Sequence, residues 1–322
     1  MLDTLVTPIV NLMHRLSFRH KFILAGGLMA LAMMVALMPG LWQMLDEHRD
    51  ISRRNRGISL ILETTEAMAL VAERRQIHLL ALRNLATSDA ASLSARSSDI
   101  ETRLASLDRQ AGAGSEAARA LADAKALWSE IGNRSAGRYN PVKASADHGA
   151  MLFALRRYLD AVAAASGIAR DTDGAAIFLA GLLARDLPGL ILGISDASSY
   201  GILAISGGIN DEDRQKLGYL ASHLPVVVDA IVTGQQHRMD SGVVAEMTES
   251  LASAVPGMAN LLLNNRVLHP EMGITPEALA QARLAATKTA SALTTAAATT
   301  LRTGLAQRQQ ENSERAYADQ RY

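Results

Sequence analysis

The sequence predicts an all-α protein, in which one N-terminal transmembrane helix precedes long antiparallel helices packed as a bundle. No stretch of the chain alternates apolar and polar residues with the period of two that marks a strand. Alanine, the strongest helix former, is abundant, whereas aromatic residues make up only 4% of the 322 residues. An uncharged apolar run near the N-terminus is long enough to cross a bilayer as a helix.

The composition and the missing motifs exclude several classes of protein. A formal net charge of zero lacks the basic excess of a general nucleic-acid-binding protein, so nucleic acid is not an expected partner. The absence of cysteine excludes disulfides, thiolate catalysis and cysteine-based metal sites. The sequence has no phosphate loop, dinucleotide-binding fingerprint, zinc-protease motif or nucleophile elbow, and none of its eight histidines pairs with another at metal-ligand spacing. We therefore expect no catalytic residue, no metal and no cofactor in this chain.

Residues 22–44 form the expected membrane span, preceded by a cytoplasmic lead at residues 1–21. The span contains no charge, its only polar side chain is that of Gln43, and Trp42 stands at the edge where an indole favours lipid headgroups. A cleaved signal peptide is an alternative, but the lead is long and no small-x-small cleavage site follows the run. A buried helix of a soluble protein is a second alternative, which the uninterrupted length of the run opposes.

A simple count of the basic residues on the two sides of the span does not indicate which end of the span faces the cytoplasm. Basic residues stand on both sides, at Arg15, Arg19, Lys21, Arg49, Arg53, Arg54 and Arg56. Arg19 and Lys21 border the apolar run directly, whereas acidic residues come first on the far side, and long domains cross a membrane largely regardless of charge. We expect a single-pass protein of the bacterial inner membrane, with residues 45–322 in the periplasm and the bilayer as a partner.

The rest of the chain reads as a succession of helices. Residues 2–16 carry leucines at helical spacing and fit either a short helix on the inner leaflet or a frayed tail. The segment after the span continues at helical spacing to about Ala86, with Gly57 as its weak point, which gives a helix about 90 Å long. Further helices are expected at about residues 90–110, 115–131, 149–172, 173–205, 211–233, 240–268 and 276–322.

Local signals set several of these boundaries. Asn210 is placed to cap the helix that follows it, and Thr275 with Pro276 begins the last helix. Pro256 is expected to kink or split its helix. Residues 132–147, with their glycines, asparagines and proline, read as a loop and as a candidate division within the large domain.

Three polar clusters are candidates for binding a small ligand. Two arginines and a histidine in the distal part of the first long helix can hold a small anion such as a carboxylate, with a solvated face of salt bridges as the alternative. The Arg156–Tyr158 cluster has the same alternative, and the residues from Asp171 to Asp173 either cap a helix or line a polar pocket. If the arginines face inward, one of these acids or a bound anion should meet them. The candidate ligand-binding residues are Arg74, Arg75, His78, Arg156, Asp171 and Asp173.

Three segments carry a resemblance to a known class of protein. Residues 15–22 read RLSFRHKF, residues 171–173 read DTD and are followed by Leu187-Pro188, and residues 274–276 read ITP. These resemble, in order, the basic lead into the first span, a D-P-D-x-D-S-Y-Y stretch with a later L-P-E-L, and the start of the last periplasmic helix in bacterial membrane-bound sensors. The class comprises methyl-accepting chemotaxis proteins and GGDEF-type diguanylate cyclases with an all-helical periplasmic domain. The chain departs from the pattern because it lacks the tyrosine pair and has Gly189 after the proline, so no ligand residue is transferred.

The resemblance implies a periplasmic sensor domain that binds a small molecule between helices and signals by shifting them along the membrane normal. It also implies a homodimer formed through the first and last helices. The chain stops where a second span and a cytoplasmic output domain would follow, so we expect the sensing half alone. The alternative is a membrane-anchored scaffold that binds a protein partner; a long apolar surface stripe would favour it, and a concave polar pocket would favour sensing.

Overall fold

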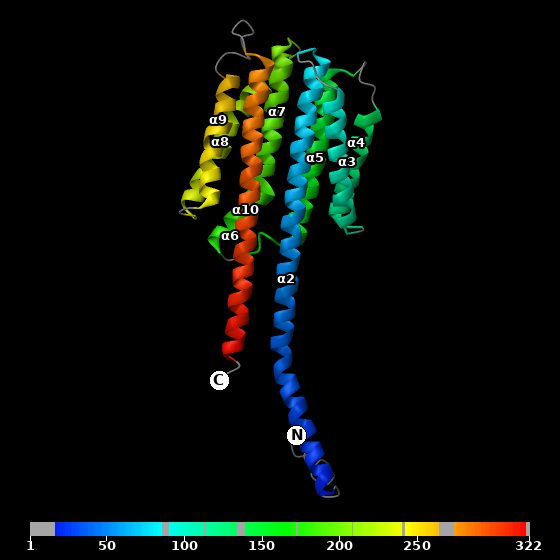
Figure 1. The fold of residues 1–322 in the computed structure, drawn as a ribbon, viewed down its shortest axis with the longest axis vertical. Coiled ribbons are helices and arrows are strands. Elements are labelled where there is room, and N and C mark those ends of the chain that lie inside the picture. The colour runs from blue at the N-terminus through cyan, green and yellow to red at the C-terminus, as the bar shows by residue number, and fades with distance from the viewer. Residues whose placement is uncertain are drawn as a thin grey trace. The chain divides into compact units, whose positions relative to one another are not determined.

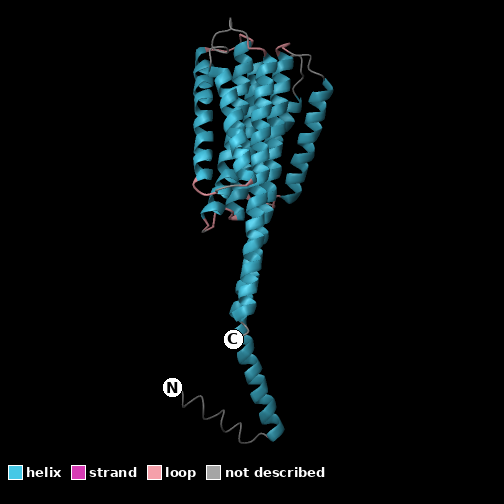
Figure 2. Ribbon diagram, turned by 60° about the vertical axis from the view of Figure 1, so that its left-hand side comes forward, coloured by secondary structure: helices cyan, strands magenta, loops and turns pink. Residues whose placement is uncertain are grey.

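The computed structural model describes residues 17–319, apart from gaps at residues 86–89, 113, 134–138, 172, 208, 240–241 and 264–273. Every regular element among the described residues is helical, and none of these residues forms a strand (Figure 2). The expected all-α class is therefore confirmed. The helix or tail expected at residues 2–16 and the last three residues of the chain lie outside the described residues.

The helices follow the chain in simple order. They are α2 (Phe18–Leu82), α3 (Ala90–Gln110), α4 (Glu116–Asn133), α5 (Pro141–Ser166), α6 (Gly174–Gly181), the π-helical η2 (Leu182–Asp186), α7 (Leu187–Ile205), α8 (Asp211–Gln236), α9 (Val243–Leu263) and α10 (Pro276–Asp319). The π-helical turn joins α6 to α7 without a break, since the N–H of Leu187 donates to the carbonyl of Leu182. The start of α10 is as expected, because the Thr275 hydroxyl accepts from the backbone N–H of Ala278 at 3.2 Å.

The chain divides into two compact units, Met1–Ser52 and Arg53–Tyr322. In the first unit, α2 leaves large apolar side chains exposed: Phe22 is 70% exposed, Met29 74% and Val35 64%. None of the described side chains of this unit is buried. This part of α2 therefore has an apolar surface without a protein core of its own.

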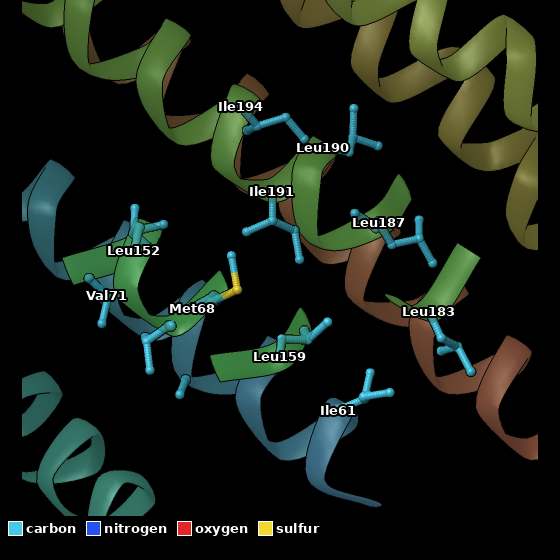
Figure 3. Packing of buried hydrophobic residues seen from close by; sticks show 14 of the residues in the cluster. Ile61, Met68, Val71, Leu152, Leu159, Leu183, Leu187, Leu190, Ile191 and Ile194 are labelled. Carbon is cyan, nitrogen blue, oxygen red and sulfur yellow. The ribbon is translucent and has the colours of Figure 1, made fainter. Parts of the chain in front are cut away.

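In the second unit, long helices pack side by side. α4 packs on α5, α5 on α7, α7 on α8 and α10, and α9 on both α8 and α10. Figure 1 shows α3 with α4 on one flank and α8 with α9 on the other, with α2, α5, α7 and α10 between them. Fully buried aliphatic side chains fill the space between α2, α5 and α7, among them Ile61, Met68, Leu152, Leu159 and Ile191 (Figure 3). This apolar core holds the three helices in register.

The loop expected at residues 132–147 is wrong for residues 141–147, which form the first turns of α5. The Asn140 side chain accepts from the backbone N–H of Val142 at 2.8 Å, and Pro141 takes the first helical position. Proline there loses no intrahelical hydrogen bond, so this Asn-Pro pair starts a helix instead of breaking one.

Two expected weak points do not interrupt their helices, while α2 ends earlier than expected. α2 continues through Gly57, and α9 continues through Pro256 without being split. A Cβ at Gly57 would overlap the Cβ of Ser166, so the glycine allows α2 and α5 to approach closely. α2 stops at Leu82, short of Ala86, and Asn84 just beyond it has a φ of 53° in the left-handed region.

Two helical stretches of the second unit, Gly174–Ile205 and Asp211–Gln236, are long and apolar enough to cross a membrane. The first unit contains a shorter apolar stretch, Gly26–Met38. By length and composition alone, the described residues hold two candidate spans instead of the single one expected at residues 22–44. Of the most apolar window, 56% is buried within the protein for Gly174–Ile205 and 28% for Asp211–Gln236.

Candidate functional site

Polar side chains of three helices meet inside the second unit, beside the apolar core. Arg75 of α2, which is 4% exposed, donates from Nη1 to Asp196 Oδ1 at 2.6 Å and to Ser195 Oγ at 3.2 Å on α7. Its Nε and Nη2 donate to Ser145 Oγ of α5 at 3.3 and 2.8 Å. One guanidinium thus joins α2, α5 and α7, and these four residues are called the Arg75 cluster.

Arg74 reaches a different set of helices. Its Nε donates to Ser97 Oγ of α3 at 3.0 Å and its Nη1 to His148 Nε2 of α5 at 2.6 Å. The guanidinium carbon lies 4.8 Å from the ring centre of Trp128 on α4, a cation–π contact. Among the described residues, no carboxylate lies within ion-pair distance of Arg74, and burial lowers the pKa of its guanidinium. Arg74 is therefore a partly buried positive charge held by neutral groups.

Two histidines beside Arg74 are held in the neutral state. His148 is fully buried; it accepts from Arg74 at Nε2 and donates from Nδ1 to the Ala144 carbonyl at 2.7 Å, because a guanidinium only donates and a carbonyl only accepts. The His78 ring packs edge-on against those of Tyr139 and His148, with centres 5.5 and 5.6 Å apart. Its buried Nδ1 has no hydrogen-bond partner in the described part of the chain. Burial, followed by the charge of Arg74, lowers the pKa of His78 to about 4, and burial lowers the pKa of His148 to about 3.

These pKa values predict that the protein loses stability on acidification. In the unfolded chain each ring binds a proton near pH 6.5, whereas in the folded protein His78 stays neutral to about pH 4 and His148 to about pH 3. The unfolded state therefore binds more protons between these limits, and stability falls as the pH falls. We expect the melting temperature to decrease from pH 7.5 to pH 5, and the His78→Leu variant to show a smaller decrease.

The control for this measurement is His223→Leu, because the His223 ring is exposed and stacks on Tyr219 at the surface. That variant should keep the pH dependence of the wild type. A His78→Leu variant with the full wild-type decrease would contradict the assigned role of His78.

Asp171 and Asp173, the acids that the sequence offered as partners for the arginines, lie elsewhere. The buried Asp171 carboxylate accepts from Arg54 at 3.4 Å and from Arg308 at 2.6 Å. Arg54 and Arg75 are about 30 Å apart along α2 at 1.5 Å per residue, so Asp171 does not reach the Arg75 cluster. Asp173 caps α6 by accepting from two backbone N–H groups, which agrees with the cap alternative.

Arg156 is also outside the Arg75 cluster. Its Nε pairs with Asp160 one turn later at 3.0 Å, and its Nη1 donates to the Arg185 carbonyl at 2.6 Å. The neighbouring Arg157 forms an exposed ion pair with Asp123 at 3.5 Å. These contacts agree with the alternative of a face laced with salt bridges.

The sequence did not single out four residues that complete this region, Ser145, His148, Ser195 and Asp196. The sequence of α7 held a signal for this region, because Ser195, Asp196, Ser198 and Ser199 interrupt a largely apolar helix, and the three serines are buried. Buried hydroxyls need partners, so a run of them in an apolar helix marks a polar contact in the core.

A surface groove brings solvent close to the Arg75 cluster. The groove has a volume of about 540 Å³, lies between α7 and α8, and is lined by Asp196, Tyr200, Lys216 and Tyr219 among others. Asp196 is 31% exposed, while its partner Arg75 is 4% exposed. The ion pair therefore has one end in the groove and the other in the core.

The arrangement offers hydrogen-bond donors and positive charge, which suit an anion. Within the part of the chain that the structure describes, no group of three or more histidine, cysteine, aspartate or glutamate side chains is placed to hold a metal ion. Comparisons with protein-family models, curated proteins and solved structures gave no match.

Proposed function

We propose that this chain is the membrane-anchored sensing region of a bacterial signal-transduction protein, of the chemoreceptor or diguanylate-cyclase type that the sequence resembles. In this proposal, residues 22–44 cross the inner membrane once and residues 45–322 form an antiparallel helical bundle in the periplasm. The protein is a homodimer through α2 and α10. A small anionic ligand binds between helices, and its different affinity for two helix arrangements provides the signal.

The observation that carries the proposal is the positive charge inside the second unit. Arg75 on α2 and Arg283 on α10 are each 4% exposed, and Arg74 is half-buried. Among the described residues, Asp196 is the one carboxylate that forms an ion pair with any of these three arginines. Burying a guanidinium without a counter-charge costs several kcal/mol, so a bound anion stabilises such an arrangement.

The exposed surface of the second unit also supports sensing over scaffolding. Its exposed large apolar side chains are spread over five helices, with two each on α5 and α8 and one each on α6, α9 and α10. No described helix of this unit has more than two of them, whereas a long apolar stripe for a partner helix needs several along one helix. The groove that reaches Asp196, by contrast, is a concave surface with polar groups.

The choice of membrane anchor rests on where apolar side chains are buried. Gly174–Ile205 supplies Leu187, Ile191 and Ile194 to the core, all of them fully buried, so moving this stretch into lipid would dismantle the core. The apolar side chains of Gly26–Met38, by contrast, are exposed and gain most from a hydrocarbon environment. This difference favours the N-terminal part of α2 as the span.

A hybrid receptor tests the proposal. The chain up to Leu305 is followed by the second span and output portion of a chemoreceptor, in cells without other receptors. We expect at least one of formate, acetate, lactate, succinate and malate to change kinase output, because the buried arginines select anions. A hybrid lacking residues 53–305 is the control and should not respond. A folded, membrane-inserted hybrid that responds to none of these acids would count against sensing and in favour of the scaffold alternative.

A further inference from the structure

Arg283 on α10 is a buried arginine without a counter-charge. It is 4% exposed, and its Nε has no hydrogen-bond partner within the described ranges. No carboxylate among the described residues lies within ion-pair distance of its guanidinium. Glu73 on α2 raises the pKa of Arg283 electrostatically, but its carboxylate is already paired with Arg96 of α3 at 3.1 Å.

The packing of α7 on α10 brings Ser198 to the level of Arg283. A Cβ built on Gly201 of α7 would lie 2.7 Å from the Leu279 side chain of α10, so these two residues face each other. The helices run in opposite directions, because Arg308 later on α10 contacts Asp171, which precedes α7 (Figure 1). Ser198 precedes Gly201 by about one turn of α7, and Arg283 follows Leu279 by about one turn of α10. Because the helices are antiparallel, both steps lead in the same direction, and Ser198 and Arg283 lie at the same level.

Ser198 also lies on the correct side of α7. In a helix of 3.6 residues per turn, it falls between the direction of Ser195, which contacts α2, and that of Gly201, which contacts α10. Ser198 therefore faces the junction of α2, α7 and α10. Its hydroxyl is buried and has no hydrogen-bond partner in the described part of the chain.

Gln76 on α2 completes this junction. It follows Arg75, which bonds to Ser195 on α7, and lies about 100° further round the helix. α2 runs opposite to α10. Arg302 of α10 bonds to Ser59 of α2, whereas Arg283, which comes earlier on α10, interacts electrostatically with Glu73, which comes later on α2. Gln76, one turn beyond Glu73, therefore lies near the level of Arg283. The Gln76 side chain is 4% exposed, and its Nε2 has no hydrogen-bond partner among the described residues.

Three helices thus bring a guanidinium, an amide and a hydroxyl together, each with an unsatisfied buried atom. All three groups can donate a hydrogen bond, and the guanidinium has no described carboxylate within ion-pair distance. Burial lowers the pKa of Arg283 to about 10, so the group is still charged at neutral pH. Such a set of donors fits the oxygens of a carboxylate, which binds a guanidinium in a fork geometry.

We propose that Arg283, Ser198 and Gln76 form a binding site for a small monocarboxylate of the size of formate or acetate. This proposal rests on the proposed function, because it names the class of ligand that the sensing region would bind and the place where that ligand would bind. The site lies at the junction of α2, α7 and α10, so a bound carboxylate would tie α10 to both α2 and α7 at the level of Arg283. The neighbouring Arg75 cluster, whose donors already have partners, holds α2 to α5 and α7.

Thermal unfolding of the full chain in detergent micelles tests the site. Sodium formate, acetate, nitrate or chloride replaces sodium gluconate at constant ionic strength, because gluconate is too bulky for a buried site. We expect formate or acetate to raise the melting temperature saturably, by on the order of 5 °C. A response to chloride as large as that to acetate would overturn the carboxylate assignment, and no saturable response to any carboxylate would overturn the site.

Two variants and one control distinguish carboxylate binding at this site from a general effect of salt on the melting temperature. Arg283→Met should abolish the carboxylate response and leave the melting temperature in gluconate unchanged or higher, because it removes an uncompensated charge. Ser198→Ala, a minimal change, should weaken the apparent affinity by about tenfold, the loss of one hydrogen bond to a charged group. Arg302→Met, on the same helix and bonded to Ser59, is the control and should respond as the wild type does.

An Arg283→Met variant that retains the full carboxylate response would contradict the site. The response of the hybrid receptor distinguishes a failure of this site from a failure of the proposed sensing function. Carboxylate binding in the full chain with a silent hybrid would contradict sensing alone. A hybrid that responds to an acid, with no carboxylate stabilisation through Arg283, would contradict only this site.

Discussion

Replacing Arg75 by methionine should lower the free energy of unfolding by about 3–5 kcal/mol, the range for removing one partner of a buried ion pair. The 4% exposed guanidinium carries four hydrogen bonds to three side chains, on α5 and α7. Without it, the buried hydroxyls of Ser145 and Ser195 each lose a hydrogen-bond donor, and α2 loses its hydrogen bonds to both helices. Chemical denaturation of the full chain in micelles measures the effect.

The Asp196→Asn variant completes a double-mutant cycle for this ion pair. We expect the double variant to lose less stability than the sum of the single losses, by about 1–3 kcal/mol, because the two groups contact at 2.6 Å. The control is Arg157→Met, whose ion pair with Asp123 has both side chains more than half exposed and should contribute less than about 1 kcal/mol. If Arg75→Met were as mild as Arg157→Met, the cluster would be no structural tie, and Arg75 would again be free to serve as a ligand contact.

The sequence predicted those features of the fold that local chemistry determines. The start of α10 follows from Thr275 and Pro276, and the start of α8 from Asn210, whose side chain accepts from the N–H of Asp213 at 2.7 Å. Such caps involve residues two or three positions apart, so they are legible in one sequence. Asn140-Pro141 carries the same kind of signal, and it was misread because asparagine and proline also occur in turns.

The partners of the polar residues could not be predicted in the same way. Arg75 and Asp196 are 121 positions apart in the sequence, and Asp171 and Arg308 are 137 apart. Asp171 and Asp196 can each supply the negative charge that an inward-facing arginine needs. The way the helices are aligned decides which of the two carboxylates is close enough to pair with Arg75. The sequence therefore identified the Arg74–His78 segment as a polar cluster on α2, but neither of the two acids it offered, Asp171 and Asp173, is the partner of Arg75.

Gly57 shows how tertiary packing can reverse a local interpretation. In one sequence, a glycine within a helix is a weak point, since it lowers helix propensity by about 1 kcal/mol relative to alanine. In the structure, the same residue is where α5 comes so close that a Cβ would overlap Ser166. The contact that explains the glycine is with a residue more than a hundred positions away, so no local rule contains it.

The second prediction tests the proposed membrane span, and the absence of cysteine from the sequence makes the test simpler. Any introduced cysteine is the only thiol in the chain, so its reaction with a membrane-impermeant maleimide reports on one position. Val35 in the first unit and Val226 on α8 form a matched pair, because the protein leaves them 64% and 61% exposed. Tyr219, on α8 and 65% exposed, gives the reference rate for a position in water.

In spheroplasts, Val226→Cys should react as fast as Tyr219→Cys, and Val35→Cys should react at least about 100-fold more slowly. The thiolate is the reacting species, and a hydrocarbon environment both suppresses its formation and excludes the charged reagent. Fast labelling of Val226→Cys before lysis would also place the second unit outside the cytoplasmic membrane. Labelling of both α8 positions only after lysis would reverse the orientation. Protection of Val226→Cys beside a reactive Tyr219→Cys would mean that Asp211–Gln236 enters the bilayer, and the single-span proposal would then be wrong.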